Sequence, residues 1–344
     1  MRNGRRWSSS DAYLRPALAR SNLTVLTDAE VRKIETQSSR ANSITVFSAG
    51  RERTIRVMSE LILCAGAIGS PTLLLASGIG PARELEELNI PVVCDIDRVG
   101  KNLQEHVSIG ISEICKAGRG LALASLPSIF LSPLRYLLTK DGLMSTNHVE
   151  AGGFARTDRS LSEPDVQFHM IPARVGVTSK GIVWGRGYFA DVCLLQPRSR
   201  GAVTLRRSGN GFAPSIDFNV LADADDRSRI VAAFRVLRQI LKAEPLANHN
   251  PVEESPGINL QSDEEIFEHC ISRLGTAYHP AGTCRMGPAD SADSVVDPEL
   301  RLLGMKNIRI ADASIMPQLI AGNTNAPTIM IAEYAADKIL SANA

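Results

Sequence analysis

The stretch richest in chemically useful side chains is 277–287, AYHPAGTCRMG. His279 stands directly before a proline and is followed by two glycines, a cysteine and an arginine. Proline disfavours the helical conformation of the residue before it, so we expect His279 on a stiff, non-helical segment. Imidazole titrates near neutral pH, and a rigidly held histidine can therefore transfer protons. A core histidine in a tight turn would give the same pattern, so this stretch alone leaves both interpretations open.

The composition is that of an ordinary soluble globular protein. The chain has 344 residues, of which 44% are hydrophobic and 22% charged, and a length of this kind favours about two domains. The net charge is +1, which gives no reason to expect nucleic acid as a partner. None of the six cysteines forms a CxxC pair, which favours reduced thiols in a cytoplasmic protein.

Neither the first residues nor the most apolar window indicates membrane insertion. The start, MRNGRRWSSS, has no apolar run behind it, so we expect no secretory signal. The most apolar window, 121–138, is interrupted by Pro127, Pro133 and Arg135 and falls short of a transmembrane span. We expect a buried or surface-lying helical segment there, with peripheral membrane contact as the less favoured alternative.

The first part of the chain alternates strands with turns and one helix. Short β-branched runs predict strands at 23–27, 31–34, 44–48, 54–58 and 61–65, with a hairpin connection at 49–52. In the following CAGAIGSPTLLLASGIGP, Ser70 suits a helix N-cap, Pro71 the first helical position and Gly78 the residue just past the end. The polar segment 97–106, DRVGKNLQEH, predicts a loop over the surface of this lobe.

The remainder predicts a second domain and then a return to the first. Strands are expected at 166–170, 188–195 and 202–205, and a helix capped by Asp223 should run to Leu241. Near the end, 307–311 predicts a strand, and Pro327 should open the last helix beside Asn323 and Asn325, an arrangement that simple capping would also explain. The predicted domains are 1–106, 107–270 and 271–344, the last returning to the first.

Several motifs together resemble the glucose–methanol–choline (GMC) family of flavin oxidoreductases, in its choline-dehydrogenase-like and alcohol dehydrogenase branch. They are GAIGSPTLLLASGIGP, RVGKNLQEH, NHVEAGGF, LQPRSRGAVTL, YHPAGTCRMG, IADASIMP and GNTNAPTIMIAEYAADKI. Their order matches the family and they cover nearly the whole chain. The resemblance implies a mixed α/β fold, with an incomplete Rossmann-like FAD-binding lobe and a substrate domain built on an antiparallel sheet with helices.

The resemblance also implies roles for individual residues. His279 falls on the family's catalytic histidine and Asn323 on its partner position, so a primary alcohol would lose its hydroxyl proton to His279 and a hydride to N5 of FAD. Glu150 falls where choline-oxidising relatives hold the substrate's cationic head; relatives that act on uncharged alcohols carry it too. The expected cofactor contacts are Val31, Tyr278, Asp312, Ala313, Asn323 and Thr324. The alcohol is then the expected partner, and the electron acceptor is left open.

The resemblance departs from the family at the start of the chain. No GxGxxG turn for the FAD pyrophosphate is present in this sequence, which predicts weak FAD binding and impaired activity. A non-catalytic carboxy-terminal remnant, or one part of a split enzyme, is the alternative. A metal site built from Cys270, His279 and Cys284 has suitable ligand types but lacks short paired spacings, and we expect no metal. A nicotinamide enzyme is disfavoured because no dinucleotide fingerprint occurs.

Overall fold

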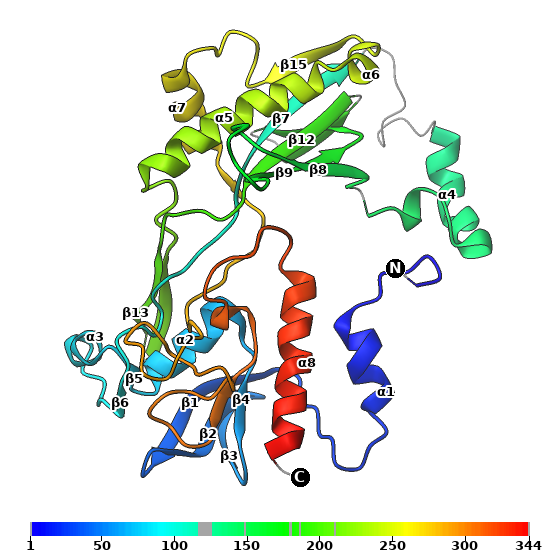
Figure 1. Cartoon of the computed structure of the whole chain (residues 1–344). Helices are drawn as coiled ribbons and strands as arrows, with labels where there is room; N and C mark the ends of the chain where they lie inside the picture. The colour runs from blue at the N-terminus through cyan, green and yellow to red at the C-terminus, as the bar shows by residue number, and fades with distance from the viewer. Residues whose placement is uncertain are drawn as a thin grey trace. The chain divides into compact units, whose positions relative to one another are not determined.

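The computed structural model describes residues 2–115, 126–147, 149–178, 181–185, 187–209 and 211–342. The chain forms two compact units (Figure 1). Unit 1 contains Met1–Arg20, His106–Leu195 and Ala224–Ala277, and unit 2 contains Ser21–Glu105, Gln196–Asp223 and Tyr278–Ala344. The predicted domain boundaries differ from these units in two places. Residues 1–20 belong to unit 1 and not with 21–105, and residues 196–223 belong to unit 2 and not with the rest of 107–270. The mixed α/β class is confirmed.

Unit 2 begins with an antiparallel sheet, in the order β1 (Ala29–Gln37), β2 (Arg40–Ser48) and β3 (Arg51–Arg56). Ala49 and Gly50 connect β2 to β3 with φ of 51° and 75°, the positive values that two-residue hairpin turns require. The predicted strand at 23–27 is wrong: this segment pairs with no strand among the described residues, and Val25 and Leu26 are exposed. A β-branched run needs a pairing partner before it becomes a strand.

A parallel strand pair and one helix form the rest of the frame of unit 2. β4 (Leu61–Leu63) pairs in parallel with β17 (Ile308–Ile310), so two segments far apart in sequence lie side by side. Both strands bury apolar side chains together with Leu74 and Leu75 of α2 (Gly66–Ala76). Because they share this core, residues near the end of the chain fold against residues near its start.

Helix α2 begins at Gly66, earlier than the predicted start at Ser70, and therefore contains Pro71. A proline inside a helix removes one N–H donor and leaves the carbonyl four residues earlier without its helical partner. That carbonyl belongs to Ala67, and the hydroxyl of Thr283 donates to it at 2.6 Å. Gly78, with φ of 80°, follows the helix end as predicted. The tertiary structure thus satisfies a group that the sequence alone leaves unsatisfied.

Short elements and the last helix complete unit 2. They are β5 (Ile79–Gly80), α3 (Ala82–Glu87), β6 (Cys94–Asp95), β13 (Ala202–Ser208), β14 (Gly211–Asp217), η4 (Ala313–Ile315) and α8 (Asn325–Ala342). The hairpin of β13 and β14 packs on α2, so it belongs to this unit. Helix α8 begins two residues before Pro327, which therefore stands in the first turn, where a missing N–H costs nothing.

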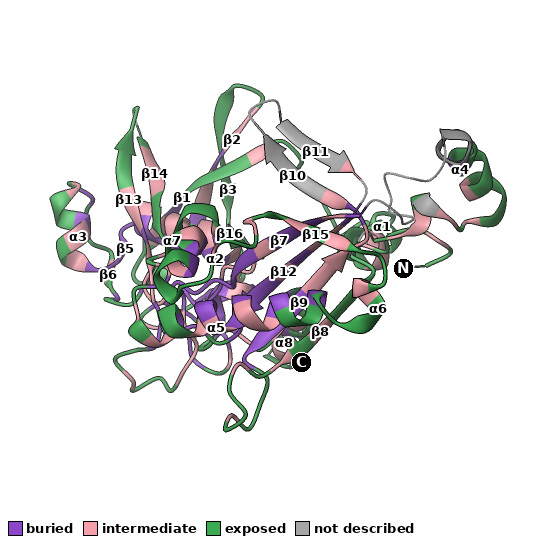
Figure 2. Ribbon diagram, turned by 90° about the horizontal axis from the view of Figure 1, so that it is seen from above, coloured by how far each residue is buried: buried purple, intermediate pink, exposed green. Residues whose placement is uncertain are grey.

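Unit 1 is built on an antiparallel sheet in the order β15-β7-β12-β9-β8, with β16 also paired to β7. The strands are β7 (Val107–Cys115), β8 (Ala151–Ala155), β9 (Val166–Ile171), β12 (Gly187–Leu194), β15 (Pro251–Ser255) and β16 (Gly275–Thr276), and β10 (Arg174–Thr178) pairs separately with β11 (Gly181–Gly185). Helix α5 (Ala224–Leu241) packs on β12, and Figure 2 colours parts of this helix as buried. Phe234 and Ile230 of α5 are fully buried. The predicted helix after Asp223 is confirmed.

The other helices of unit 1 are short, apart from α4. They are η1 (Ser10–Leu14), α1 (Arg15–Ala17), α4 (Leu126–Thr139), η3 (Leu143–Ser145), α6 (Glu244–Ala247) and α7 (Asp263–Arg273). Ser262 and Glu265 cap the start of α7 reciprocally. No described helix combines the length and the apolar character needed to cross a lipid bilayer.

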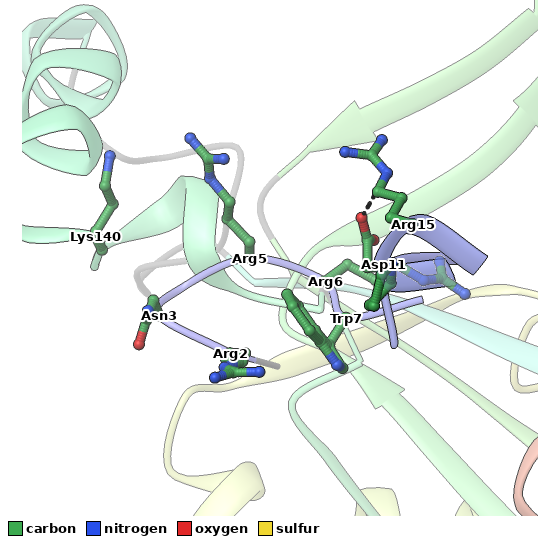
Figure 3. Close-up of a pocket in the computed structure, with 9 residues that line it drawn as sticks. Arg2, Asn3, Arg5, Arg6, Trp7, Asp11, Arg15 and Lys140 are labelled. Carbon is green, nitrogen blue, oxygen red and sulfur yellow. Dashed lines mark ion pairs between the residues drawn. The ribbon is translucent and has the colours of Figure 1, made fainter. Parts of the chain in front are cut away.

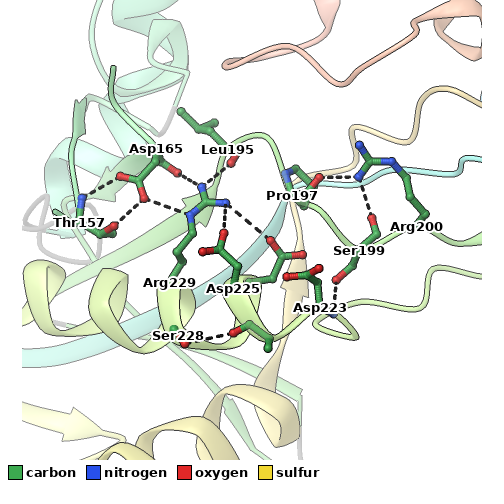
Figure 4. A network of polar contacts seen from close by, with 12 residues as sticks. Thr157, Asp165, Leu195, Pro197, Ser199, Arg200, Asp223, Asp225, Ser228 and Arg229 are labelled. Carbon is green, nitrogen blue, oxygen red and sulfur yellow. Dashed lines mark hydrogen bonds and ion pairs between the residues drawn. The ribbon is translucent and has the colours of Figure 1, made fainter. Parts of the chain in front are cut away.

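Arg229 ties helix α5 to the ends of two strands (Figure 4). Its Nε donates to Asp165 Oδ2 at 3.2 Å, and its terminal nitrogen donates to the carbonyl of Leu195 at 2.7 Å. The other oxygen of Asp165 accepts from the backbone N–H of Thr157 at 2.7 Å. Because each of these groups has a partner, the buried charge is compensated and fixes the helix on the sheet.

Glu113 is a buried carboxyl group on β7 of the unit 1 sheet. It stands opposite Glu253 on β15 and is 5% exposed, and its Oε2 has no hydrogen-bond partner among the described residues. Burial, and secondarily the charge of Glu253, raise the pKa of Glu113 from 4.5 to about 7. Glu113 is therefore largely protonated in the folded protein at acidic pH.

This buried carboxyl group predicts a pH-dependent stability. A pKa raised on folding stabilises the fold below about pH 4.5, and that stabilisation is lost as the pH rises through about 7. We expect the free energy of unfolding to fall by about 2–3 kcal/mol across this window because of Glu113. Glu113→Gln should remove most of that fall in urea titrations at several pH values, whereas Glu264→Gln, at an exposed position, should keep it. An unchanged slope in Glu113→Gln would contradict the assignment.

Candidate active site

The segment that carries His279 is non-helical, as predicted. The backbone N–H of His279 donates to Glu105 Oε1 at 2.8 Å, and its side chain is half-buried. Tyr278 before it has φ of 60°, a conformation that is strained for an aromatic residue, and its side chain is 84% exposed. Strained backbone of this kind persists only where the surroundings hold it, and it concentrates at functional sites.

The residues after His279 run alongside η4. The N–H groups of Gly282, Cys284 and Met286 donate to the carbonyls of Ala313, Ser314 and Ile315 at 3.2, 2.8 and 2.8 Å. This ladder holds the histidine segment in a fixed register against the segment that contains Asp312 and Ala313. The register matters because a proton-transfer group must keep its position to within a fraction of an ångström.

Asp312 uses its carboxylate to join η4 to helix α2. Oδ2 accepts from the N–H of Gly66 at 2.9 Å and from the hydroxyl of Ser70 at 2.6 Å, and Oδ1 accepts from the N–H of Ser314 at 2.8 Å. Ser70 therefore does not cap α2 as predicted, and the carboxylate of Asp312 meets the first N–H of that helix instead. Both carboxylate oxygens of Asp312 therefore accept hydrogen bonds from the protein.

The prediction of a surface loop at 97–106 is wrong for the second half of that segment. Leu103, Gln104 and Glu105 are 0%, 1% and 6% exposed. Gln104 exchanges two backbone hydrogen bonds with Ala281, both of 3.0 Å, and its Oε1 accepts from the N–H of Leu319 at 3.0 Å. Asn102 donates to the carbonyl of Gly282 at 3.0 Å. Polar side chains are buried here because they satisfy the backbone of other segments.

Gln104 thereby connects the segments of the two residues expected to act together. Ala281 stands two positions after His279, and Leu319 stands four positions before Asn323. Asn323 is exposed and lies directly ahead of α8, whose first intrahelical bond runs from the N–H of Thr328 to the carbonyl of Thr324 at 3.0 Å. The N–H groups that precede this bond give the start of α8 a partial positive charge. Sequence reasoning missed the role of Gln104, although it singled out the motif that contains it.

Comparison with known protein families identifies the family of this chain. Family models of GMC oxidoreductases match residues 1–108 and 197–332. The chain belongs to the GMC oxidoreductase family.

Individual relatives support the same membership. This GMC chain is 39% identical over 345 residues to alcohol dehydrogenase [acceptor] of Pseudomonas putida, covering 98% of the chain and 62% of that protein. It is 38% identical over 341 residues to oxygen-dependent choline dehydrogenase of Brucella ovis, again covering 98% of the chain and 62% of that protein. The chain therefore spans about 62% of the length of the curated relatives that it matches.

Solved structures agree on the fold. Pyridoxine 4-oxidase from Mesorbium loti has a TM-score of 0.82 at 29% identity, covering 98% of the GMC chain and 62% of that chain. A formate oxidase has a TM-score of 0.84 at 26% identity, covering 94% and 62%.

The other residues that the resemblance singled out belong to both units. Val31, on β1 of unit 2, pairs with Val46 and is 38% exposed. Glu150 belongs to unit 1 of the GMC chain and is exposed; its N–H donates to the carbonyl of Met170 at 3.2 Å, and Thr146 Oγ1 donates to its Oε1 at 2.7 Å. Thr324, which directly precedes α8, is buried.

The three residues of the metal alternative in the GMC chain are divided between the two units. Cys270 belongs to unit 1, whereas His279 and Cys284 belong to unit 2. Burial raises the pKa of Cys270 to about 12 and also raises the pKa of Cys284. Within the described ranges, potential metal ligands gather at His169, Asp191 and Cys193. There the carboxylate and the sulfur both approach Nδ1 of the histidine, at 2.9 and 3.9 Å, so these residues are not arranged as a proton relay.

Proposed function

We propose that this GMC chain takes part in the FAD-dependent oxidation of a primary alcohol to an aldehyde. The single observation that carries the proposal is the contact of Gln104 with both Ala281 and Leu319, because it links the segments of His279 and Asn323. The two relatives reported above are named for the oxidation of an alcohol and of choline, which is itself a primary alcohol.

The residues of unit 2 suit a flavin. Among the described residues, apart from chain neighbours and the backbone of the same helix, no atom lies within 4 Å of the position that a Cβ would take at Gly66 or Gly322. The backbone at the start of α2 and shortly before α8 therefore has room for a ligand. Backbone groups of Val31, Asp312 and Ala313 would hold FAD together with Tyr278, Asn323 and Thr324.

Alcohol oxidation needs a base for the hydroxyl proton and an acceptor for the hydride. FAD, when bound, would supply the hydride acceptor at its N5, since no side chain accepts a hydride. His279 removes the hydroxyl proton, and the half-buried position of its ring keeps it accessible to a substrate. The amide of Asn323 donates to the developing alkoxide without titrating. The start of α8 stabilises negative charge nearby.

Glu150 is the proposed substrate contact. Its side chain is exposed and its position is fixed by the backbone bond to Met170. A carboxylate suits the cationic head of choline, but a carboxylate can equally accept a hydrogen bond from an uncharged alcohol. The proposal therefore names primary alcohols as the class.

The experiment is an aldehyde assay on protein supplied with FAD. Bound flavin is measured first by its visible absorbance, and a panel of primary alcohols that includes choline is then offered with an artificial electron acceptor. Aldehyde formation is expected. Protein that holds FAD but oxidises no alcohol of the panel would contradict the proposal, and protein that binds no FAD would favour the non-catalytic alternative.

A further inference from the structure

Three side chains that can bind a metal ion lie together on the sheet of unit 1. They are His169 of β9 and Asp191 and Cys193 of β12, and their donor atoms all lie within 4.8 Å of one another. Nδ1 of His169 is 2.9 Å from Oδ1 of Asp191 and 3.9 Å from Sγ of Cys193. The three donor atoms therefore surround one small space beside Nδ1.

The pairing of β9 with β12 places these side chains on one face of the sheet. Asp191 and Cys193 are two residues apart on one strand, and alternate residues of a strand point to the same face. His169 stands directly opposite Asp191 in the antiparallel register. Directly opposed residues share a face, with their Cβ atoms about 5 Å apart. Two paired strands, rather than a loop, thus hold the three donors in place.

The group is accessible to solvent on one side. His169 and Asp191 keep 22% and 23% of their side-chain surface exposed, whereas Cys193 is 1% exposed. The residue that pairs with His169 on the next strand, β8, is Gly152, which has no side chain to cover the imidazole. A metal ion can therefore reach the three donors from solvent, and a water molecule can complete its ligands.

The three donors match the preferences of zinc. Zinc binds imidazole nitrogen, thiolate sulfur and carboxylate oxygen in a tetrahedral arrangement, and sites with three protein ligands keep a fourth position for water. Its bond lengths place neighbouring donor atoms about 3.3–3.6 Å apart. The observed distances of 2.9 and 3.9 Å lie on either side of this range, so only small side-chain movements are needed. Calcium and magnesium prefer oxygen ligands, so a thiol and an imidazole disfavour both.

The hollow of about 680 Å³ near the start of the chain, also in unit 1, has the opposite character (Figure 3). The cations that line it are Arg2, Arg5, Arg6, Arg15 and Lys140. Its carboxylate, Asp11, already pairs with Arg15 at 3.1 Å. This positive charge would repel a metal ion. The group on the sheet is therefore the better place for a metal in unit 1.

We propose that His169, Asp191 and Cys193 bind a zinc ion, with water as the fourth ligand. Zinc takes the place of the proton on Nδ1, and the imidazole carries its proton on Nε2 instead. The thiol of Cys193 releases its proton to solvent as the sulfur binds the metal. The sequence-based expectation of no metal concerned a different set of residues. It did not consider these three because strand pairing, rather than short spacing, brings His169 to the other two.

Zinc titration of the whole chain tests this proposal. Metal-free protein is titrated with zinc against a chromophoric chelator, and separately with cobalt, whose absorption spectrum reports its ligands. One zinc per chain is expected, together with a thiolate-to-cobalt charge-transfer band. Binding should weaken as the pH is lowered, because protons compete with the metal. His169→Ala, Asp191→Ala and Cys193→Ser should each weaken zinc binding by at least about 100-fold, since the loss of even an outer-shell partner costs about 10- to 100-fold.

The matched control is Cys115→Ser. Cys115 is a buried cysteine on β7 of the same sheet, 2% exposed against 1% for Cys193. Its zinc affinity should equal that of the wild type, and circular dichroism should show the same fold for Cys115→Ser and Cys193→Ser. A wild type that binds no zinc, or a cobalt complex without the thiolate band, would overturn the proposal. Zinc binding that survives Cys193→Ser and His169→Ala would also overturn it. The readout requires no FAD and is independent of alcohol oxidation.

Discussion

Replacing His279 with alanine is expected to lower turnover of a primary alcohol by about 10²–10⁴-fold, the usual weight of a general base. The backbone at this position is held by Glu105 and by the ladder to η4, so the substitution should remove the imidazole without moving the segment. The measurement is the rate of aldehyde formation with an artificial electron acceptor, at matched content of bound FAD.

His249→Ala is the control for this variant. His249 belongs to unit 1, where its ring contacts Tyr188 edge-on, and it has no place in the proposed reaction. Its turnover should match the wild type. If His279→Ala retained full turnover with its flavin bound, the histidine would not be the base.

Asp312→Ala is expected to lower the free energy of unfolding by about 3–5 kcal/mol. The carboxylate is 4% exposed and accepts from Gly66, Ser70 and Ser314, so its removal leaves three donors without an acceptor. Each unsatisfied buried donor costs about 1–3 kcal/mol, and partial relaxation reduces the sum. Urea denaturation followed by circular dichroism measures the change.

The matched control replaces an aspartate that makes a similar contact at the surface. Asp158 is exposed and accepts from the N–H of Ser160 at 2.7 Å. Asp158→Ala should change the free energy of unfolding by at most about 1 kcal/mol. If Asp312→Ala also lowered the free energy of unfolding by only about 1 kcal/mol, water would have replaced the carboxylate. The link between α2 and η4 would then contribute little to stability.

Local patterns in the sequence were reliable where neighbouring residues decide the structure. The hairpin of β2 and β3 follows from a positive-φ turn between two alternating runs, and helix α5 follows from apolar residues at helical spacing. The non-helical setting of His279 follows from the proline after it. These features depend on φ preferences and periodicity, which act over a few residues.

The errors arose where a distant segment supplies the partner. The sequence placed the start of α2 at Ser70 because serine followed by proline is a common helix start, but Asp312 and Thr283 allow the helix to begin at Gly66 and to keep Pro71. Residues 23–27 have strand-forming side chains and no strand to pair with. Neither Asp312 nor Thr283 can be connected with α2 from the sequence pattern.

By itself, the sequence determined the family and the mixed α/β class, since these depend on motif order and residue type, and it supplied the hypothesis that His279 is the base. Only the tertiary structure decided that Gln104 and Glu105 are buried against the histidine segment and that α4 exposes its leucines. The physical reason is the same in both cases. A polar residue is buried when a distant backbone satisfies it, and an apolar face stays exposed when no segment of the fold covers it.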